Sequence, residues 1–155
     1  MLVILSILAL VALDQIVKYW AVTVLAPAVT IPLIDGVFAL TYVENTGAAF
    51  GLLAGKNQQY LLAAIALVVV LAAVWALKNG WALTALGKVS IYLIIAGAVG
   101  NLIDRVARGF VVDLFSFELI HFPVFNVADI YVVVGVILFL VYNLFLHDKA
   151  EAAQK

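Results

Sequence analysis

Two aspartates in the C-terminal third of the chain have the residue type needed for a hydrolytic site. Asp113 lies in a strand-like stretch, and Asp129 directly precedes the last apolar run. When two acids share a site, one pKa is raised and the other lowered, so the pair holds a single proton at neutral pH. One acid can then deprotonate water while the other protonates the carbonyl or the leaving amine. If the two segments meet, the pair predicts peptide hydrolysis without a metal or a covalent intermediate.

The composition around these acids is that of an integral membrane protein. Of the 155 residues, 68% are hydrophobic and 11% are charged, whereas soluble domains average roughly 45–50% apolar and about 25% charged residues. An ionisable residue costs about 2.5 kcal/mol or more at the bilayer centre, so such residues in a membrane chain mark functional sites. The net charge is -1 with no run of Lys or Arg, and we therefore expect no nucleic-acid partner.

Four apolar stretches are long enough to cross a bilayer. They predict a membrane α-helical fold, one domain over residues 1–155, with spans at about 2–25, 60–77, 81–103 and 130–146. A secretory signal peptide is the alternative for the first stretch, because Ala26-Pro27-Ala28 resembles a small-residue cleavage site. The absence of a basic region before it favours a retained helix.

Four spans place both termini on one side of the membrane. The distribution of lysines favours cytoplasmic termini. The lysines on that side are Lys78, Lys88, Lys149 and Lys155. The connection over residues 30–53 is rich in β-branched and aromatic residues around the hairpin-type dipeptide Asp35-Gly36. The strand-like residues 109–117 can pair with it. We expect a small extracytoplasmic β-sheet.

Other polar residues gather near the same helix ends and could support the two acids. Asp14 and Lys18 are four residues apart and can pair on one helix face. Asn126 can cap the last helix, with Asp129 in its first turn. The remaining candidates are Asn45, Gly47, Asn101, Asp104 and Arg105. Each group also has a structural explanation: an intrahelical ion pair, a helix cap, an anchor at the headgroup level, or a turn at the sheet edge.

Other catalytic chemistries have weaker support in the sequence. Cysteine is absent, which excludes a thiolate nucleophile and Cys-based metal sites. Ser116 has no convincing base beside it. His121 lies among apolar residues, and we expect it at the membrane interface with no assigned role. We therefore expect no metal and no cofactor.

Five sequence motifs, taken together and in their order along the chain, give it a resemblance to a known family. It resembles lipoprotein signal peptidase (signal peptidase II), the aspartyl membrane protease family of the bacterial inner membrane. The motifs are Asp14-Gln15 with Lys18, Asn45-Thr46-Gly47-Ala48-Ala49-Phe50, Gly100-Asn101-Leu102-Ile103-Asp104-Arg105, Val112-Asp113, and Phe125-Asn126-Val127-Ala128-Asp129.

The resemblance implies four spans, cytoplasmic termini and a site near the outer membrane surface. It implies that Asp113 and Asp129 are the catalytic pair, with the other polar candidates around them. The implied partners are membrane lipid and a prolipoprotein signal peptide with a diacylglyceryl-cysteine, cleaved just before that cysteine, and the protein is expected to be a monomer. Two alternatives remain: a small ion-coupled carrier and a signal-peptide-binding membrane protein without catalysis.

Overall fold

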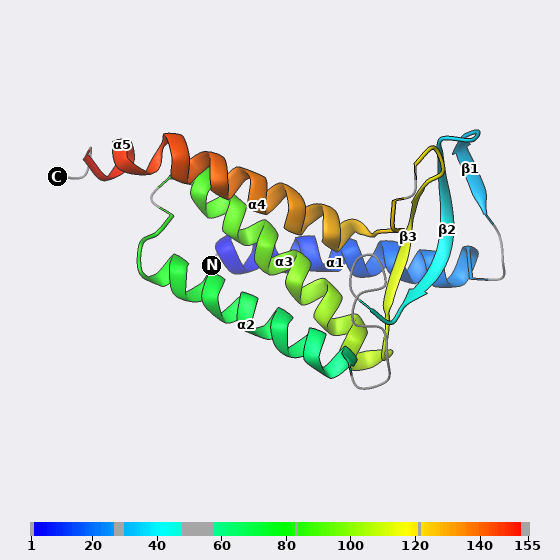
Figure 1. The fold of residues 1–155 in the computed structure, drawn as a ribbon. Coiled ribbons are helices and arrows are strands. Elements are labelled where there is room, and N and C mark those ends of the chain that lie inside the picture. The colour runs from blue at the N-terminus through cyan, green and yellow to red at the C-terminus, as the bar shows by residue number, and fades with distance from the viewer. Residues whose placement is uncertain (1, 27–29, 48–57, 83, 121, 153–155) are drawn as a thin grey trace.

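Four long helices lie beside one another, with a small sheet at one end (Figure 1). This computed structural model describes residues 2–26, 30–47, 58–82, 84–120 and 122–152. The helices are α1 (Leu2–Val24), α2 (Gln58–Lys78), α3 (Ala85–Ala107) and α4 (Val127–Phe145), followed by the short α5 (His147–Ala152). All but α5 are long and apolar enough to cross a membrane, which confirms the predicted four-span fold.

The start of the third span differs from the prediction. Hydropathy placed it at residue 81, but α3 begins at Ala85 because Thr84 caps it, its side chain accepting a hydrogen bond from the Gly87 N–H at 3.2 Å. Lys88, which the count of lysines placed before the span, is thus part of the helix. The last span begins slightly earlier than predicted, at Val127.

Helix α3 is the centre of the bundle, since α1, α2 and α4 all pack against it. Small residues allow α3 and α4 to approach closely. A Cβ atom at Gly97 would collide with the backbone oxygen of Ala128, and one at Gly135 would lie 2.8 Å from the backbone oxygen of Ser90. Among the described residues, the backbones of α2 and α4 do not approach each other closely, and α3 lies between them.

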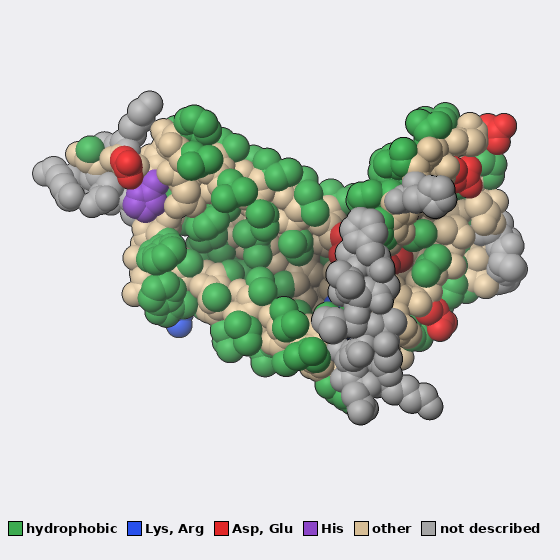
Figure 2. Space-filling view, viewed as in Figure 1, with side chains coloured by type: hydrophobic (Ala, Val, Ile, Leu, Met, Phe, Trp, Pro, Cys, Tyr) green, Lys and Arg blue, Asp and Glu red, His purple; other side chains and the backbone are tan. Residues whose placement is uncertain are grey.

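The surface of the bundle suits a lipid environment. Figure 2 shows hydrophobic side chains covering the visible helix surface, whereas the charged side chains in view lie toward its two ends. The most exposed apolar side chains include Ile4, Val68 and Leu144, at 63%, 64% and 74% exposure. Large apolar surfaces of this kind are stable in contact with lipid tails rather than water.

A three-stranded antiparallel sheet lies at the end of the bundle. The strands β1 (Ile31–Ile34), β2 (Phe38–Asn45) and β3 (Val111–Phe117) are ordered β1-β2-β3. The predicted hairpin is confirmed, with Gly36 at a φ of 65° in its turn, a conformation that glycine adopts at little cost. The predicted pairing of the two connections is also confirmed, because β2 pairs with β3.

The segment that leads into α4 is fastened to β3. Phe115 and Phe125 exchange backbone hydrogen bonds of 2.8 Å and 3.1 Å, and their rings lie 5.5 Å apart. Phe117 also stacks on Phe125, at 5.6 Å between ring centroids. This link holds the start of α4 beside β3 and so brings two segments with polar residues together.

Candidate active site

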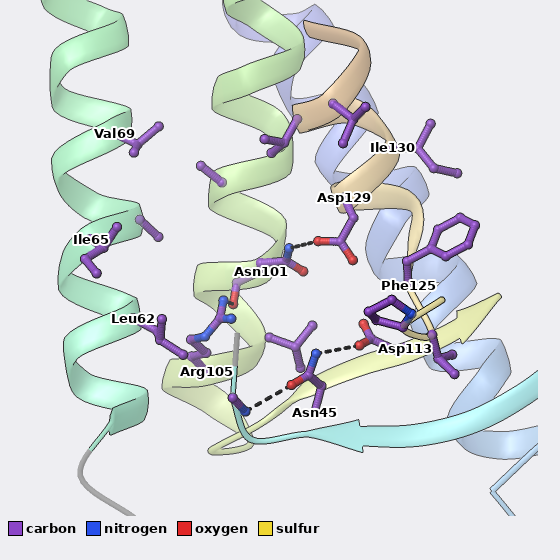
Figure 3. Close-up of a pocket in the computed structure, with 18 of the residues that line it drawn as sticks. Asn45, Leu62, Ile65, Val69, Asn101, Arg105, Asp113, Phe125, Asp129 and Ile130 are labelled. Atoms are coloured by element: carbon purple, nitrogen blue, oxygen red, sulfur yellow. Dashed lines mark hydrogen bonds between the residues drawn. The ribbon is translucent and has the colours of Figure 1, made fainter. Parts of the chain in front are cut away.

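A cavity of about 600 Å³ opens where α2, α3 and α4 meet the sheet. Its polar wall is formed by Asn45, Gly47, Asn101, Arg105, Asp113 and Asp129 (Figure 3). Its apolar wall includes Leu62, Ile65, Ala66, Val69, Ala98, Ile130, Val133 and Val134. This volume lies in the range of small-molecule and substrate pockets, about 300–1,000 Å³.

Asp113 is buried at the polar wall, with only 1% of its surface exposed. The strand pairing places it opposite Val43 and near Asn45. The Asn45 amide donates to its Oδ2 at 2.8 Å, and the Asn126 amide donates to its Oδ1 at 2.6 Å. Burial, and after it the negative charge of Asp129, raise the pKa of Asp113 from 3.8 to about 6. The two amide donors and Lys18 oppose these effects without cancelling them.

Asp129 lies in the first turn of α4, as the sequence predicted. It forms a reciprocal capping box with Asn126. The Asn126 N–H donates to Asp129 Oδ2 at 3.1 Å, and the Asp129 N–H donates to Asn126 Oδ1 at 3.0 Å. Asn101 donates its amide to Asp129 Oδ1 at 2.8 Å. The predicted cap is confirmed, but the same asparagine also holds Asp113, so it joins the two acids.

A fully buried ion triad lies behind this wall. Lys18 Nζ is 3.0 Å from Asp14 Oδ2 and 3.1 Å from Asp104 Oδ2, and all three side chains have no exposed surface. The predicted Asp14–Lys18 pair is confirmed, and Asp104 of α3 meets the charge of Lys18 on α1. The second oxygen of Asp104 lies 3.4 Å from Arg108 Nε. Asp104 lies near the end of α3, whereas Asp14 and Lys18 lie in the second half of α1.

The triad also fixes the backbone next to both acids. Asp14 Oδ1 accepts a hydrogen bond of 2.9 Å from the N–H of Ala128, the residue before Asp129. Asp104 Oδ2 accepts one of 3.1 Å from the N–H of Val112, the residue before Asp113. Sequence analysis missed these contacts, because backbone donors carry no sequence signal.

Arg105 lines the cavity and donates to the Asn101 carbonyl oxygen at 3.3 Å. Within the described residues no carboxylate lies at ion-pair distance from its guanidinium, so it is available to a substrate group. Gly47 is buried, and its N–H donates to Asn45 Oδ1 at 3.0 Å. The rest of this motif, residues 48–50, and His121 lie outside the described residues.

Two residues that were not predicted from the sequence to belong to the site also contribute to it. Gln15 donates to Asp14 Oδ2 at 3.1 Å and to the Gly100 carbonyl oxygen at 3.2 Å. Gly100 packs against the Asp14 carboxylate, because a Cβ there would lie 2.5 Å from Oδ2. Both residues belong to recognised motifs, and their adjacency to Asp14 and Asn101 is the available signal. Among the described residues, no group of three or more His, Cys, Asp or Glu could hold a metal ion.

Four spans with two linked acids in a cavity at one end define a polytopic membrane protein with a candidate hydrolytic centre. A family model described as "Signal peptidase (SPase) II" matches residues 6–145, and the chain belongs to this family of peptidases. This membership confirms the resemblance seen in the sequence. It does not favour the ion-coupled carrier.

Relatives and solved structures agree with the family. Lipoprotein signal peptidase of Clostridioides difficile (strain 630) is 48% identical over 151 residues, covering 97% of this chain and all of the relative. The enzyme of that name from Nostoc punctiforme is 44% identical over 131 residues, covering 83% of this chain and 80% of the relative.

Two structures described as bacterial membrane enzymes, solved by the in meso method at 2.3 Å and 1.9 Å resolution, superpose with TM-scores of 0.79 and 0.80. They are 32% and 33% identical to this chain. The first match covers 92% of this chain and 87% of the other; the second covers 93% of each.

Proposed function

We propose that the protein is an aspartic endopeptidase that removes the signal peptide from prolipoproteins just before a diacylglyceryl-modified cysteine. Asp113 and Asp129 are its catalytic residues. The observation that carries this proposal is the shared bonding to Asn126, which holds both carboxyl groups on the wall of one cavity. The relatives named lipoprotein signal peptidase support the substrate class.

The environments of the two acids suggest their roles. Asp113 holds the shared proton, because burial and the neighbouring Asp129 raise its pKa to about 6. Asp129 is the base, since it lines the cavity with its two oxygens fixed in place by two donors, the Asn101 amide and the Asn126 N–H.

Hydrolysis then proceeds in two steps. Asp129 takes a proton from water, the hydroxide oxygen bonds to the scissile carbonyl carbon, and Asp113 gives its proton to the carbonyl oxygen. In the second step the C–N bond breaks, the proton on Asp129 passes to the leaving nitrogen, and a hydroxyl proton of the intermediate returns to Asp113. The pair ends with one proton, as it began.

The shape of the cavity fits a lipid-modified substrate. Its apolar wall is formed by α2, α3 and α4, and α3 lies between the other two helices. Acyl chains can lie along this wall from the bilayer side while the peptide reaches the two acids. Arg105, which is part of the polar wall and has no carboxylate at ion-pair distance among the described residues, binds a carbonyl oxygen of the substrate.

The position of the site indicates how the protein sits in a bacterial inner membrane. The sheet lies at one end of the bundle, while α5 and the first turn of α1 lie away from it (Figure 1). The cavity is lined by residues of β2 and β3, so it opens at the sheet end. We place the termini in the cytoplasm and the site near the extracytoplasmic surface. One chain supplies the whole polar wall, which supports action as a monomer.

Processing of a diacylglyceryl-modified precursor by purified protein in detergent, followed by gel mobility, tests the proposal. Wild-type protein should shorten the precursor, and Asp113→Asn and Asp129→Asn should each fail to do so while remaining folded. Asp35→Asn, in the exposed hairpin turn, is the matched control and should keep full activity. Turnover by either site variant would remove that residue from catalysis, whereas binding of the precursor without cleavage by wild-type protein would favour a non-catalytic binding protein.

A further inference from the structure

The site depends on the orientation of three asparagine amides. Each carboxyl oxygen of Asp113 accepts from an amide NH₂ group, as does Oδ1 of Asp129. An amide rotated by half a turn would place its oxygen against a carboxyl oxygen, which is repulsive. Whatever binds the oxygen of each amide therefore decides whether its NH₂ group faces the acids.

Backbone groups orient two of these amides. Asn45 Oδ1 accepts from the Gly47 N–H, and Asn126 Oδ1 accepts from the Asp129 N–H. The third differs: Asn101 Oδ1 accepts from Lys18 Nζ at 2.9 Å and from the Asn126 amide at 3.2 Å. The hydrogen bond from the ammonium group is the shorter of the two, and its donor is charged. Charge-assisted hydrogen bonds are roughly twice as strong as neutral ones.

We propose that Lys18 is a positioning residue that acts through Asn101: its ammonium group fixes the amide so that Nδ2 donates to Asp129 Oδ1 (Figure 3 shows the Asn101–Asp129 bond). The inference rests on the proposed function, because it explains how the base is held in position. Lysine carries only donors and cannot accept from the NH₂ group of a rotated amide. A wrongly oriented Asn101 is thus excluded at both of its ends.

Charged groups face both ends of the chain of hydrogen bonds that runs from Lys18 through Asn101 to Asp129. Lys18 is faced by Asp14 on its own helix and by Asp104 on α3. Asp129 is faced by Asp113 on β3 and by Arg105 on α3, which interact electrostatically with it. Because Lys18 is fully buried between two acids, the single Lys18→Met variant leaves the buried Asp14 without a counter-charge and Asp104 with Arg108 alone, and it is expected to fold poorly.

A neutral triad separates positioning from folding. The triple variant Lys18→Met, Asp14→Asn, Asp104→Asn removes all three charges yet keeps side-chain oxygens that accept from the Ala128 and Val112 N–H groups. It should fold, with kcat for precursor processing reduced about 10- to 100-fold, the size expected for the loss of one hydrogen bond to a charged group. Lys88→Met, exposed at the start of α3, is the control for loss of a lysine charge and should leave kcat unchanged.

A double-mutant cycle then asks whether the effect passes through Asn101. The triple variant is made with Asn101 intact and together with Asn101→Ala, and kcat is measured for each against its parent. The fold reduction in kcat that the triple change causes should fall from about 10–100 to about 2 or less once Asn101 is removed. With Asn101 intact, KM for the precursor should stay close to the wild-type value, because the change acts on the position of the base and not on substrate binding.

Three outcomes contradict the inference. Equal factors with and without Asn101 would show that the triad acts by another route, and an unchanged kcat in the triple variant would show that it does not act on the chemistry. A triple variant that does not fold would assign the charges to the fold itself. In all three the wild-type protein is active, so the proposed function stands; an inactive wild-type protein would overturn both.

Discussion

Because Asp113 is buried at the site, its ionisation should lower the stability of the folded protein at neutral pH. Its pKa is raised from 3.8 to about 6, first by burial and then by the charge of Asp129. The folded protein therefore holds this proton more tightly than the unfolded chain, and stability from this group is lost as pH rises from about 4 to about 6. At about 1.4 kcal/mol per pKa unit, the loss is about 3 kcal/mol.

The variant Asp113→Asn removes this dependence. Its amide adds a fixed penalty at every pH, because an NH₂ group then faces a donor of Asn45 or Asn126. The informative quantity is thus the change with pH and not the offset. Wild-type protein should lose stability relative to the variant between pH 4 and pH 7, and the loss corresponds to roughly 6–12 °C in Tm for a chain of this size.

Thermal unfolding of both proteins at several pH values in one detergent measures this effect. Asp35→Asn, in the exposed turn, is the control whose curve should follow the wild type. Parallel curves for wild type and Asp113→Asn would refute the reasoning, since they would mean that Asp113 titrates alike in the folded and unfolded states. A wild type that gains stability relative to the variant as pH rises would mean that the sign is wrong.

Three further changes have clear expected results. Gly100→Ala should lower both Tm and kcat, because its Cβ would lie 2.5 Å from Asp14 Oδ2 and push away the carboxylate that holds the Ala128 N–H; unchanged Tm and kcat would show that the helices accommodate it. Asp14→Asn should reduce kcat or Tm less severely than loss of either catalytic acid, and an inactive but fully stable variant would mean that Asp14 is itself catalytic. Ala66→Trp should raise KM several-fold with little change in kcat by filling the apolar wall; an unaltered KM would place the acyl chains elsewhere.

The spans were predictable because each is set by local hydropathy. The exception was the start of α3, where Trp81 and Ala82 extend the apolar stretch although the cap at Thr84 begins the helix. The hairpin at Asp35-Gly36 was predictable for the same reason, since a turn dipeptide between strand-like runs is a local signal.

The geometry of the site was only partly predictable. Asn126 was recognised as a cap from its spacing to Asp129, but its bond to Asp113 depends on the pairing of Phe115 with Phe125, which no local pattern encodes. Helical spacing likewise gave the Asp14–Lys18 pair. It could not give the Lys18–Asn101 bond, because the relative rotation of α1 and α3 follows from packing of whole helices.

The pH dependence of kcat/KM in the presence of a metal chelator tests the central claim most directly. A pair that works with one shared proton loses activity when both acids are protonated and when both are ionised. Catalysis by this pair predicts a bell-shaped profile that chelators and serine- or cysteine-directed reagents leave unchanged, with its basic limb near pH 6, the pKa of Asp113 in the free protein. Activity that is abolished by the chelator and restored by zinc, or a profile with no basic limb, would contradict catalysis by the Asp113–Asp129 pair.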